Sequence, residues 1–166
     1  YFLNAIFIAR RTARTSGTSI EEAVANFFLE PEENFRVLVE TANDAIVSFD
    51  NEGRILLWNY AAEKIFGYNR SEAVGSILSD LIIPDGYADI LKKEMKDFTV
   101  TGKSTQIRKT IEIEAQRKYG KVFPVEFSIS ARETSDGWWI YTGIIRDITG
   151  RKQAEEALRE SEARFR

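Results

Sequence analysis

The sequence predicts an α+β domain in which five strands form one antiparallel sheet with helices on one face. Two short strand-like stretches, 45–50 and 54–59, are joined by a turn. Helical patterns then occupy residues 61–98. Three further strand-like segments follow at 110–115, 122–132 and 138–148. Because two strands precede the helices and three follow them, a single antiparallel sheet accommodates the whole order.

The central helices are predicted from caps and apolar spacing. Asn59 is placed to cap a helix over 61–66, which Gly67 ends. Short helical turns are expected at 71–74, 79–82 and around Pro84. A longer helix over 87–98 carries an apolar stripe at Ile90, Leu91, Met95 and Phe98.

The last strands are predicted from strict alternation of apolar and polar residues. In 110–115 and in 122–132 every second residue is apolar, which is typical of a sheet with one buried and one wet face. The turns between the three strands fall at 118–121 and 135–137.

Two amphipathic helices precede the domain. A capping box at Ser19–Glu22 begins the first helix, whose apolar residues include Phe27 and Phe28. The second starts at 32–33 and has Phe35 and Leu38 on its apolar face. We expect both helices to pack against a neighbouring domain or a second copy of the chain rather than to bind a ligand.

A charged helix follows from Gly150. Its apolar and small residues recur at the 4-3-4 spacing of a coiled-coil seam, at Ala154, Leu158, Ser161 and Phe165. Two ion pairs spaced i,i+4, Glu155–Arg159 and Glu160–Arg164, are expected on this helix. The seam is too short to be stable alone, so we expect it to continue beyond the chain or to be held by a homodimer.

Composition excludes several classes of chemistry. The chain has no Cys and no His, which removes disulfides, Cys/His zinc sites, the usual haem ligands and catalytic triads. A net charge of -3 argues against nucleic acid as a partner. Glu112 and Glu114 resemble a catalytic pair, but their alternation with Ile111 and Ile113 marks a solvated strand face. We therefore expect no catalytic residue and no metal site in this chain.

The apolar run at residues 1–9 is too short to span a bilayer and lacks the pattern of a signal peptide. We expect no membrane insertion by this segment and a cytoplasmic location. The chain begins at Tyr1 rather than Met, so we expect it to be a piece of a longer protein.

Four separated motifs resemble those of PAS domains: DNEGRILLWN at 50–59, AAEKIFGY at 61–68, FPVEFSI at 123–129 and RDIT at 146–149. The resemblance covers residues 34–149. It implies the PAS fold, with a five-stranded antiparallel sheet and a ligand pocket between sheet and helices. It also implies a sensory module of a multidomain signalling protein.

The resemblance divides the chain into three parts: an N-terminal helical extension at 1–33, the PAS domain at 34–149 and a signalling linker helix at 150–166. Residues 160–166 are similar to the opening of a PAS domain, as are residues 33–39. This similarity implies further sensor modules and an output domain in the same chain, and by family frequency a histidine kinase.

The same resemblance bears on cofactors. The position at which some PAS domains carry a haem-ligating histidine holds Leu91, and Met95 on the same helix is interpreted as core filling. Haem is not expected, and without cysteine an adduct-forming flavin is excluded. Non-adduct flavin binding stays open, since Trp58, Trp138 and Trp139 offer aromatic faces, although they also suit a structural role.

By analogy with the family, the pocket lining is apolar and consists of Leu91, Met95, Ile111, Phe127 and Ile129. Tyr68 and Ser79 are the polar residues expected near it. Such a lining suits a filled core or a small apolar ligand, and we favour the filled core. The turn at 117–120 departs from the family because Tyr119 stands where Asp is usual, which puts the shape of that hairpin in doubt.

Signal coupling is expected at Asp147, Ile148 and Thr149, where the last strand meets the exit helix. An Asp at a helix N-terminus also stabilises the helix dipole, and the two roles are compatible. We interpret the chain as a non-enzymatic sensory module that relays a signal through its exit helix. Two alternatives remain open, a dimerisation module without ligand and a flavin redox sensor.

Overall fold

The computed structural model describes residues 31–101 and 109–165 and separates the chain into two compact units, residues 1–42 and 43–166. The predicted helix with Phe27 and Phe28 lies outside the described residues. The helix expected from 32–33 is present as α3 (Pro31–Thr41). On it Leu38 is half-buried, whereas Phe35 is 60% exposed.

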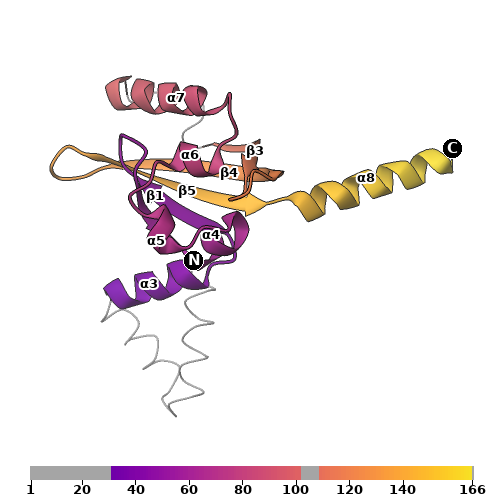
Figure 1. Ribbon diagram of the computed structural model, residues 1–166, viewed down its shortest axis with the longest axis horizontal. Helices are drawn as coiled ribbons and strands as arrows, with labels where there is room; N and C mark the ends of the chain where they lie inside the picture. Colours follow the sequence, from indigo (N-terminus) through magenta and orange to yellow (C-terminus); the bar gives the residue numbers. More distant parts are fainter. Residues whose placement is uncertain (1–30, 102–108, 166) are drawn as a thin grey trace, which may run out of the picture. The chain divides into compact units, whose positions relative to one another are not determined.

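The second unit contains one antiparallel sheet in the order β2-β1-β5-β4-β3, which confirms the predicted fold class (Figure 1). The strands are β1 (Ala45–Phe49), β2 (Ile55–Trp58), β3 (Thr110–Gln116), β4 (Val122–Glu133) and β5 (Trp139–Asp147). The first and last strands in sequence pair at the centre, with Ala45 opposite Ile145. This pairing brings the start of the domain beside its exit.

The β1–β2 turn is stabilised by Asp50. Its carboxylate accepts hydrogen bonds from the backbone amides of Glu52 and Arg54, each at 2.9 Å. Gly53 adopts a φ of 81°, which a residue with a Cβ rarely does. The turn predicted at 51–53 is therefore held by the side chain of Asp50, the residue directly after β1.

Between β2 and β3 the described residues form four helices: α4 (Tyr60–Phe66), α5 (Arg70–Ala73), α6 (Leu78–Ile82) and α7 (Ala88–Thr101). Asn59 caps α4 as predicted, since its side-chain oxygen accepts the amide of Ala62 at 3.0 Å. The same oxygen accepts the amide of Ile46 at 2.9 Å, and the Asn59 amide group donates to the carbonyl of Asp44 at 3.1 Å. One fully buried side chain thus joins β1 to α4.

The core lies between the helices and one face of the sheet. Burial alternates along β1 and β4, so every second side chain points into the core. Examples are Val47, Phe49, Phe127 and Ile129. Phe49 stacks on Tyr141 with ring centres 5.5 Å apart. Gly143 of β5 lies beneath Phe127, where a Cβ would approach the ring to 2.7 Å. The aromatic packing therefore requires a residue without a side chain at this point of the sheet.

The β3–β4 hairpin closes without an Asp in its turn. The amide of Arg117 donates to the carbonyl of Lys121 at 2.9 Å, and Gly120 adopts a φ of 79°. Tyr119 projects into solvent and is 92% exposed. Glycine and the backbone ladder are sufficient to form this turn, so the departure from the family pattern does not alter the hairpin.

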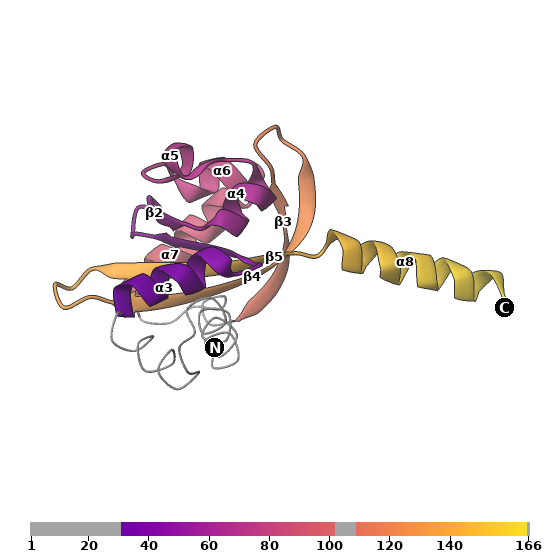
Figure 2. The same cartoon turned by 90° about the horizontal axis from the view of Figure 1, so that it is seen from below.

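The exit helix is α8 (Thr149–Arg164), which begins one residue before the predicted start. It continues from the end of β5 and runs away from the sheet in both views (Figures 1 and 2). Arg164 lies 4.0 Å from Glu160 as predicted, but Arg159 pairs with Glu156 at 2.7 Å instead of Glu155. Within residues 31–101 and 109–165, no helix has the length and apolar character needed to cross a membrane.

Candidate functional site

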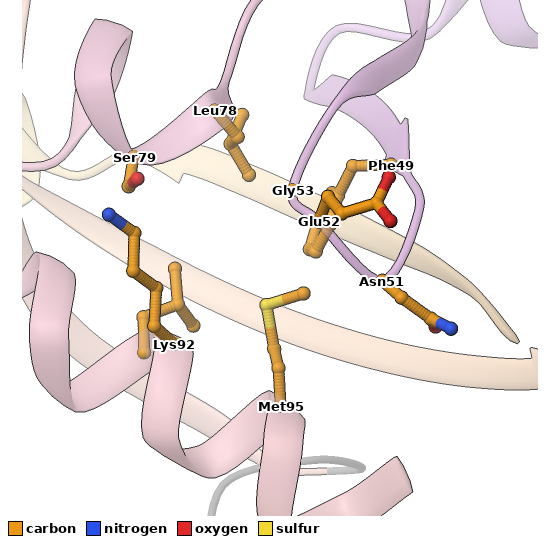
Figure 3. A pocket seen from close by; sticks show the side chains of 9 residues that line it. Phe49, Asn51, Glu52, Gly53, Leu78, Ser79, Lys92 and Met95 are labelled. Atoms are coloured by element: carbon orange, nitrogen blue, oxygen red, sulfur yellow. The ribbon is translucent and has the colours of Figure 1, made fainter.

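A small cavity lies between α6, α7 and the β1–β2 turn (Figure 3). Its volume is about 60 Å³. The residues that line it are Phe49, Asn51, Glu52, Gly53, Leu78, Ser79, Leu91, Lys92 and Met95. Figure 3 shows Lys92 reaching from α7 toward Ser79 of α6, and Met95 extending from α7 toward Glu52 and Gly53 of the turn.

The structure brings together three of the seven residues predicted for the pocket, namely Ser79, Leu91 and Met95. Ile111, Phe127 and Ile129 belong to the core on the inner face of the sheet and do not line this cavity. Tyr68 lies elsewhere, after α4, where its carbonyl accepts the indole N–H of Trp58 at 3.0 Å. Within the described residues, this cavity therefore lies at the α6, α7 and β1–β2 turn rather than over the predicted residues of β3 and β4.

Aromatic side chains pack between α7 and the sheet. Phe98 of α7 packs edge-on against Trp139 and Tyr141, with ring centres 5.1 and 6.3 Å away. The Tyr141 hydroxyl donates to the carbonyl of Met95 at 3.3 Å. These contacts tie α7 to the sheet. Ligand pockets for drug-sized molecules usually measure about 300–1,000 Å³, several times more than this cavity.

The cavity offers little chemistry of its own. Ser79 is the buried polar residue in its wall, and its hydroxyl contacts Asp80 at 3.4 Å. Glu52 and Lys92 are both exposed at its rim. Among the described residues, no group of three or more acidic side chains is placed to hold a metal ion.

The second candidate site is the joint between β5 and α8. Asp147 ends the strand, and its Oδ1 accepts the backbone amide of Thr149, the first residue of the helix, at 2.9 Å. Ile148 between them is only 2% exposed and donates its amide to the carbonyl of Pro124 at 3.2 Å. The helix therefore leaves the domain from a buried and hydrogen-bonded residue.

Arg117 completes this joint, and the sequence did not single it out as functional. Its Nη2 lies 2.7 Å from Asp147 Oδ2, and its Nη1 donates to the carbonyl of Ile65 at the end of α4. The guanidinium also sits over the ring of Phe123, 3.8 Å from its centre. One side chain from the β3–β4 turn thus contacts α4, β4 and the end of β5.

These contacts change the acidity of Asp147. Partial burial alone raises the pKa of this carboxyl group, but hydrogen bonds from Thr149 and Arg117 and the positive charge of Arg117 outweigh burial. The net effect holds the pKa of Asp147 below its ordinary value of 3.8. Asp147 is therefore ionised at neutral pH, and its charge is compensated within the joint.

The predicted seam residues of α8 are open to solvent. Leu158 is 61% exposed and Phe165 is 88% exposed, and no residue of α8 is buried. Exposed apolar side chains on one stripe of a helix mark an interaction surface more often than a monomer surface. In the described chain, the stripe at Ala154, Leu158, Ser161 and Phe165 is the part of α8 suited to a partner helix.

A sequence model of the PAS fold matches residues 33–148, and the chain belongs to the PAS family. A protein of Azorhizobium caulinodans is 32% identical over 123 residues, which cover 74% of this chain and 17% of that protein. Sensor protein FixL of Bradyrhizobium diazoefficiens is 27% identical. The match covers 84% of this chain and 27% of FixL. The cell-division control histidine kinase PdhS of Brucella ovis is 28% identical. The match covers 76% of this chain and 12% of PdhS.

Solved structures give the same fold. A PAS domain from Colwellia psychrerythraea aligns with a TM-score of 0.60 and 26% identity, over 71% of this chain and 97% of that one. A PAS domain of an HTR-like protein from Haloarcula marismortui aligns with a TM-score of 0.59 and 23% identity, over 75% and 97% of the two chains. This chain is a PAS sensor domain homologous to those of sensor histidine kinases, and the PAS module itself is non-catalytic.

Proposed function

We propose that this chain relays a signal through α8 to an output domain, as a homodimer and within a histidine kinase. The observation that carries the proposal is the joint at Asp147, where β5 passes directly into the exit helix. A shift of the sheet moves the Arg117–Asp147–Thr149 contacts, and α8 moves with them. Two arrangements that differ by a few kcal/mol suffice for such a relay.

The proposal of a homodimer rests on the exposed stripe of α8. A helix of sixteen residues with this composition is marginal alone, so a partner helix that covers Leu158 and Phe165 would stabilise it. A parallel pair of exit helices would also deliver the same displacement to two copies of an output domain. The α3 residues Phe35 and Leu38 are further candidates for the dimer contact, as are Phe27 and Phe28 outside the described residues.

The small cavity favours a second candidate function, a dimerising relay without an organic ligand. Phe98 packs against Trp139 and Tyr141 between α7 and the sheet, which supports an interior held by side chains. About 60 Å³ accommodates a few water molecules but not the ring system of a flavin or a haem. On this reading the signal reaches the domain from a neighbouring module, and a small apolar ligand is the remaining chemical alternative.

The assignment to a histidine kinase rests on the relatives. FixL is named a sensor protein and PdhS a histidine kinase, and this chain corresponds to 27% and 12% of their lengths. We infer a parent of the same organisation, in which the catalytic domain lies outside this chain. The domain limits 34–149 and 150–166 stay as our proposed division of sensor and linker.

Native mass spectrometry of the chain, purified without denaturation, tests this function. We expect a dimer without added mass, and we expect Leu158→Asp to convert it into a monomer because a buried seam would then hold two carboxylates. Gln153→Asp, an exposed position of the same helix outside the seam, is the control and leaves the dimer intact. A monomeric wild-type chain would refute the dimeric relay, and a dimer carrying a flavin mass would refute the relay without ligand.

A further inference from the structure

The outer face of the sheet carries a row of charged residues beside the start of α8. Cross-strand pairing places Arg146 of β5 opposite Glu126 of β4, and Glu126 opposite Glu112 of β3. Asp44, just before β1, extends the row because its carboxylate accepts two hydrogen bonds from Arg146 at 3.1 and 2.8 Å. Charged residues of β3, β4 and β5, and the residue just before β1, therefore lie side by side across the sheet.

Within this row Glu112 and Glu126 present a conflict. Two like charges placed directly opposite on adjacent antiparallel strands destabilise the pair. The sheet itself offers Glu126 only a distant cation, since Arg146 Nη1 lies 3.9 Å away, and Arg146 is already engaged with Asp44. The two carboxylates therefore form an acidic site that needs cations from outside the sheet.

The first turn of α8 supplies those cations. Arg151 bridges the two strands, with Nη2 at 2.6 Å from Glu112 Oε1 and Nη1 at 3.2 Å from Glu126 Oε2. Lys152 Nζ lies 2.5 Å from the other oxygen of Glu112. The hydrogen bond from Lys152 is the main cause that lowers the pKa of Glu112, and the charges of Lys152 and Arg151 act in the same direction. With Asp44 and Arg146, the row contains three acidic and three basic side chains and is balanced.

Arg151 also belongs to the seam. Leu158 follows Arg151 by seven residues, and Phe165 follows Leu158 by seven, so all three occupy the same position of the heptad. In a parallel dimer this position faces its own copy, where two guanidinium groups would repel each other. The residue that would begin the seam is thus held instead by carboxylates of its own domain.

We propose that Glu112, Glu126, Arg151 and Lys152 form an ionic latch, which fixes the first turn of α8 to β3 and β4 and competes with extension of the dimer seam toward the domain. The inference rests on the proposed relay through α8 and adds the contact that regulates the position of this helix. Each pair is solvent-exposed, with side chains 25–47% accessible, so individually the pairs contribute little to stability. A contact of this strength is suited to opening when β3 and β4 shift or when salt screens it.

The latch is tested by a distance measurement within one chain. The protein has no cysteine, so spin labels are introduced by Ser130→Cys on the outer face of β4 and Arg159→Cys on α8, in full-length chain diluted with unlabelled protein. We expect a narrow distance distribution that broadens or shifts when Glu112→Gln and Glu126→Gln are combined, and likewise when Arg151→Gln and Lys152→Gln are combined. Glu114→Gln, the exposed neighbour on the same face of β3, is the matched control and leaves the distribution unchanged.

Competition with the seam has its own readout. Arg151→Leu both opens the latch and adds an apolar seam residue, so we expect the dimer dissociation constant to fall by about tenfold or more. Gln153→Leu, outside both the seam and the latch, leaves it within about threefold. An unchanged distance distribution in both double variants, at unchanged thermal midpoint, overturns the latch. A monomeric chain with a latch-dependent distance would instead refute the dimeric relay and leave the latch standing.

Discussion

The two faces of the sheet differ in how their side chains are held. On the inner face Phe49, Phe127 and Tyr141 are buried and touch other rings, and a glycine is required beneath one of them. On the outer face Glu126 pairs with Arg146, and both Glu112 and Glu126 pair with Arg151 of α8, in ion pairs that contact water. Burial of large apolar groups dominates folding energy, whereas exposed ion pairs are weak.

This difference separates stability from coupling. Changes to the inner face are expected to unfold the domain, because close-packed cores tolerate neither gaps nor extra atoms. Changes to the outer face and the β5–α8 joint are expected to alter the path of the exit helix while the domain stays folded. The predictions below compare a buried position with a matched exposed one.

The largest effect is expected at Asn59. Asn59→Ala leaves the buried amide of Ala62 and the part-buried amide of Ile46 without their acceptor, so we expect a loss of about 2–4 kcal/mol of unfolding free energy. Asn69→Ala removes the corresponding cap from α5 at an exposed site and is expected to cost about 1 kcal/mol. Urea denaturation measures both values, and equal losses would contradict the role assigned to Asn59 in joining β1 to α4.

A smaller loss is expected at Gly143. Gly143→Ala places a methyl group 2.7 Å from the Phe127 ring and 3.2 Å from a Val47 methyl, so we expect destabilisation of about 1–3 kcal/mol from overpacking. Gly150→Ala adds the same methyl group to α8 with no atom within 4 Å, and is expected to be neutral or to stabilise by up to about 1 kcal/mol. Thermal unfolding distinguishes them, and a stable Gly143→Ala variant would indicate that the Phe127 ring is free to move.

The smallest effect is expected at Asp147 and depends on pH. Because the pKa of Asp147 in the folded chain is lowered below 3.8, the stability that its ionised form adds is present at higher pH and is lost as pH falls through the lowered value. Asp147→Asn removes this group, so we expect the wild-type advantage over the variant to shrink between about pH 5 and pH 2.

The measurement is unfolding free energy of wild type and variant at a series of pH values. Asp136→Asn, in the exposed β4–β5 turn, serves as the control, because no comparable joint surrounds it. If wild type and Asp147→Asn kept a constant difference across the acidic range, the ion pair with Arg117 would not be the source of the stabilisation.

Local patterns predicted most of the elements because their causes are local. The cap at Asn59, the glycine that ends α4 and the alternation along β3 and β4 all act within a few residues, and the helices and strands begin and end close to the predicted positions. Local patterns did not predict which residues line the cavity. Leu91, Phe127 and Ile129 are all apolar, and apolar character alone does not distinguish a residue that lines a cavity from one that fills the core.

The residues of the joint and the latch illustrate the same limit. Alternation placed Glu112 on a wet face, and the same alternation places Glu126 on that face, but neither pattern reveals that the two carboxylates are paired across strands. Arg117 belongs to a turn by sequence, and its contacts with Ile65 and Asp147 join residues 52 and 30 positions apart. Such contacts depend on strand register, which is set by the packing of the whole sheet.

By itself, the sequence indicated that this chain is a PAS domain with an exit helix. It also excluded any chemistry that needs cysteine or histidine, because the chain contains neither. The resemblance of four motifs indicated the family, and periodicity, caps and turn residues placed its elements, because each of these acts between neighbours in the chain. Only the tertiary structure decided how tightly the interior is packed and which charged side chains pair at the first turn of α8. Both depend on side chains distant in sequence, whose distances are fixed only when helices and sheet pack together.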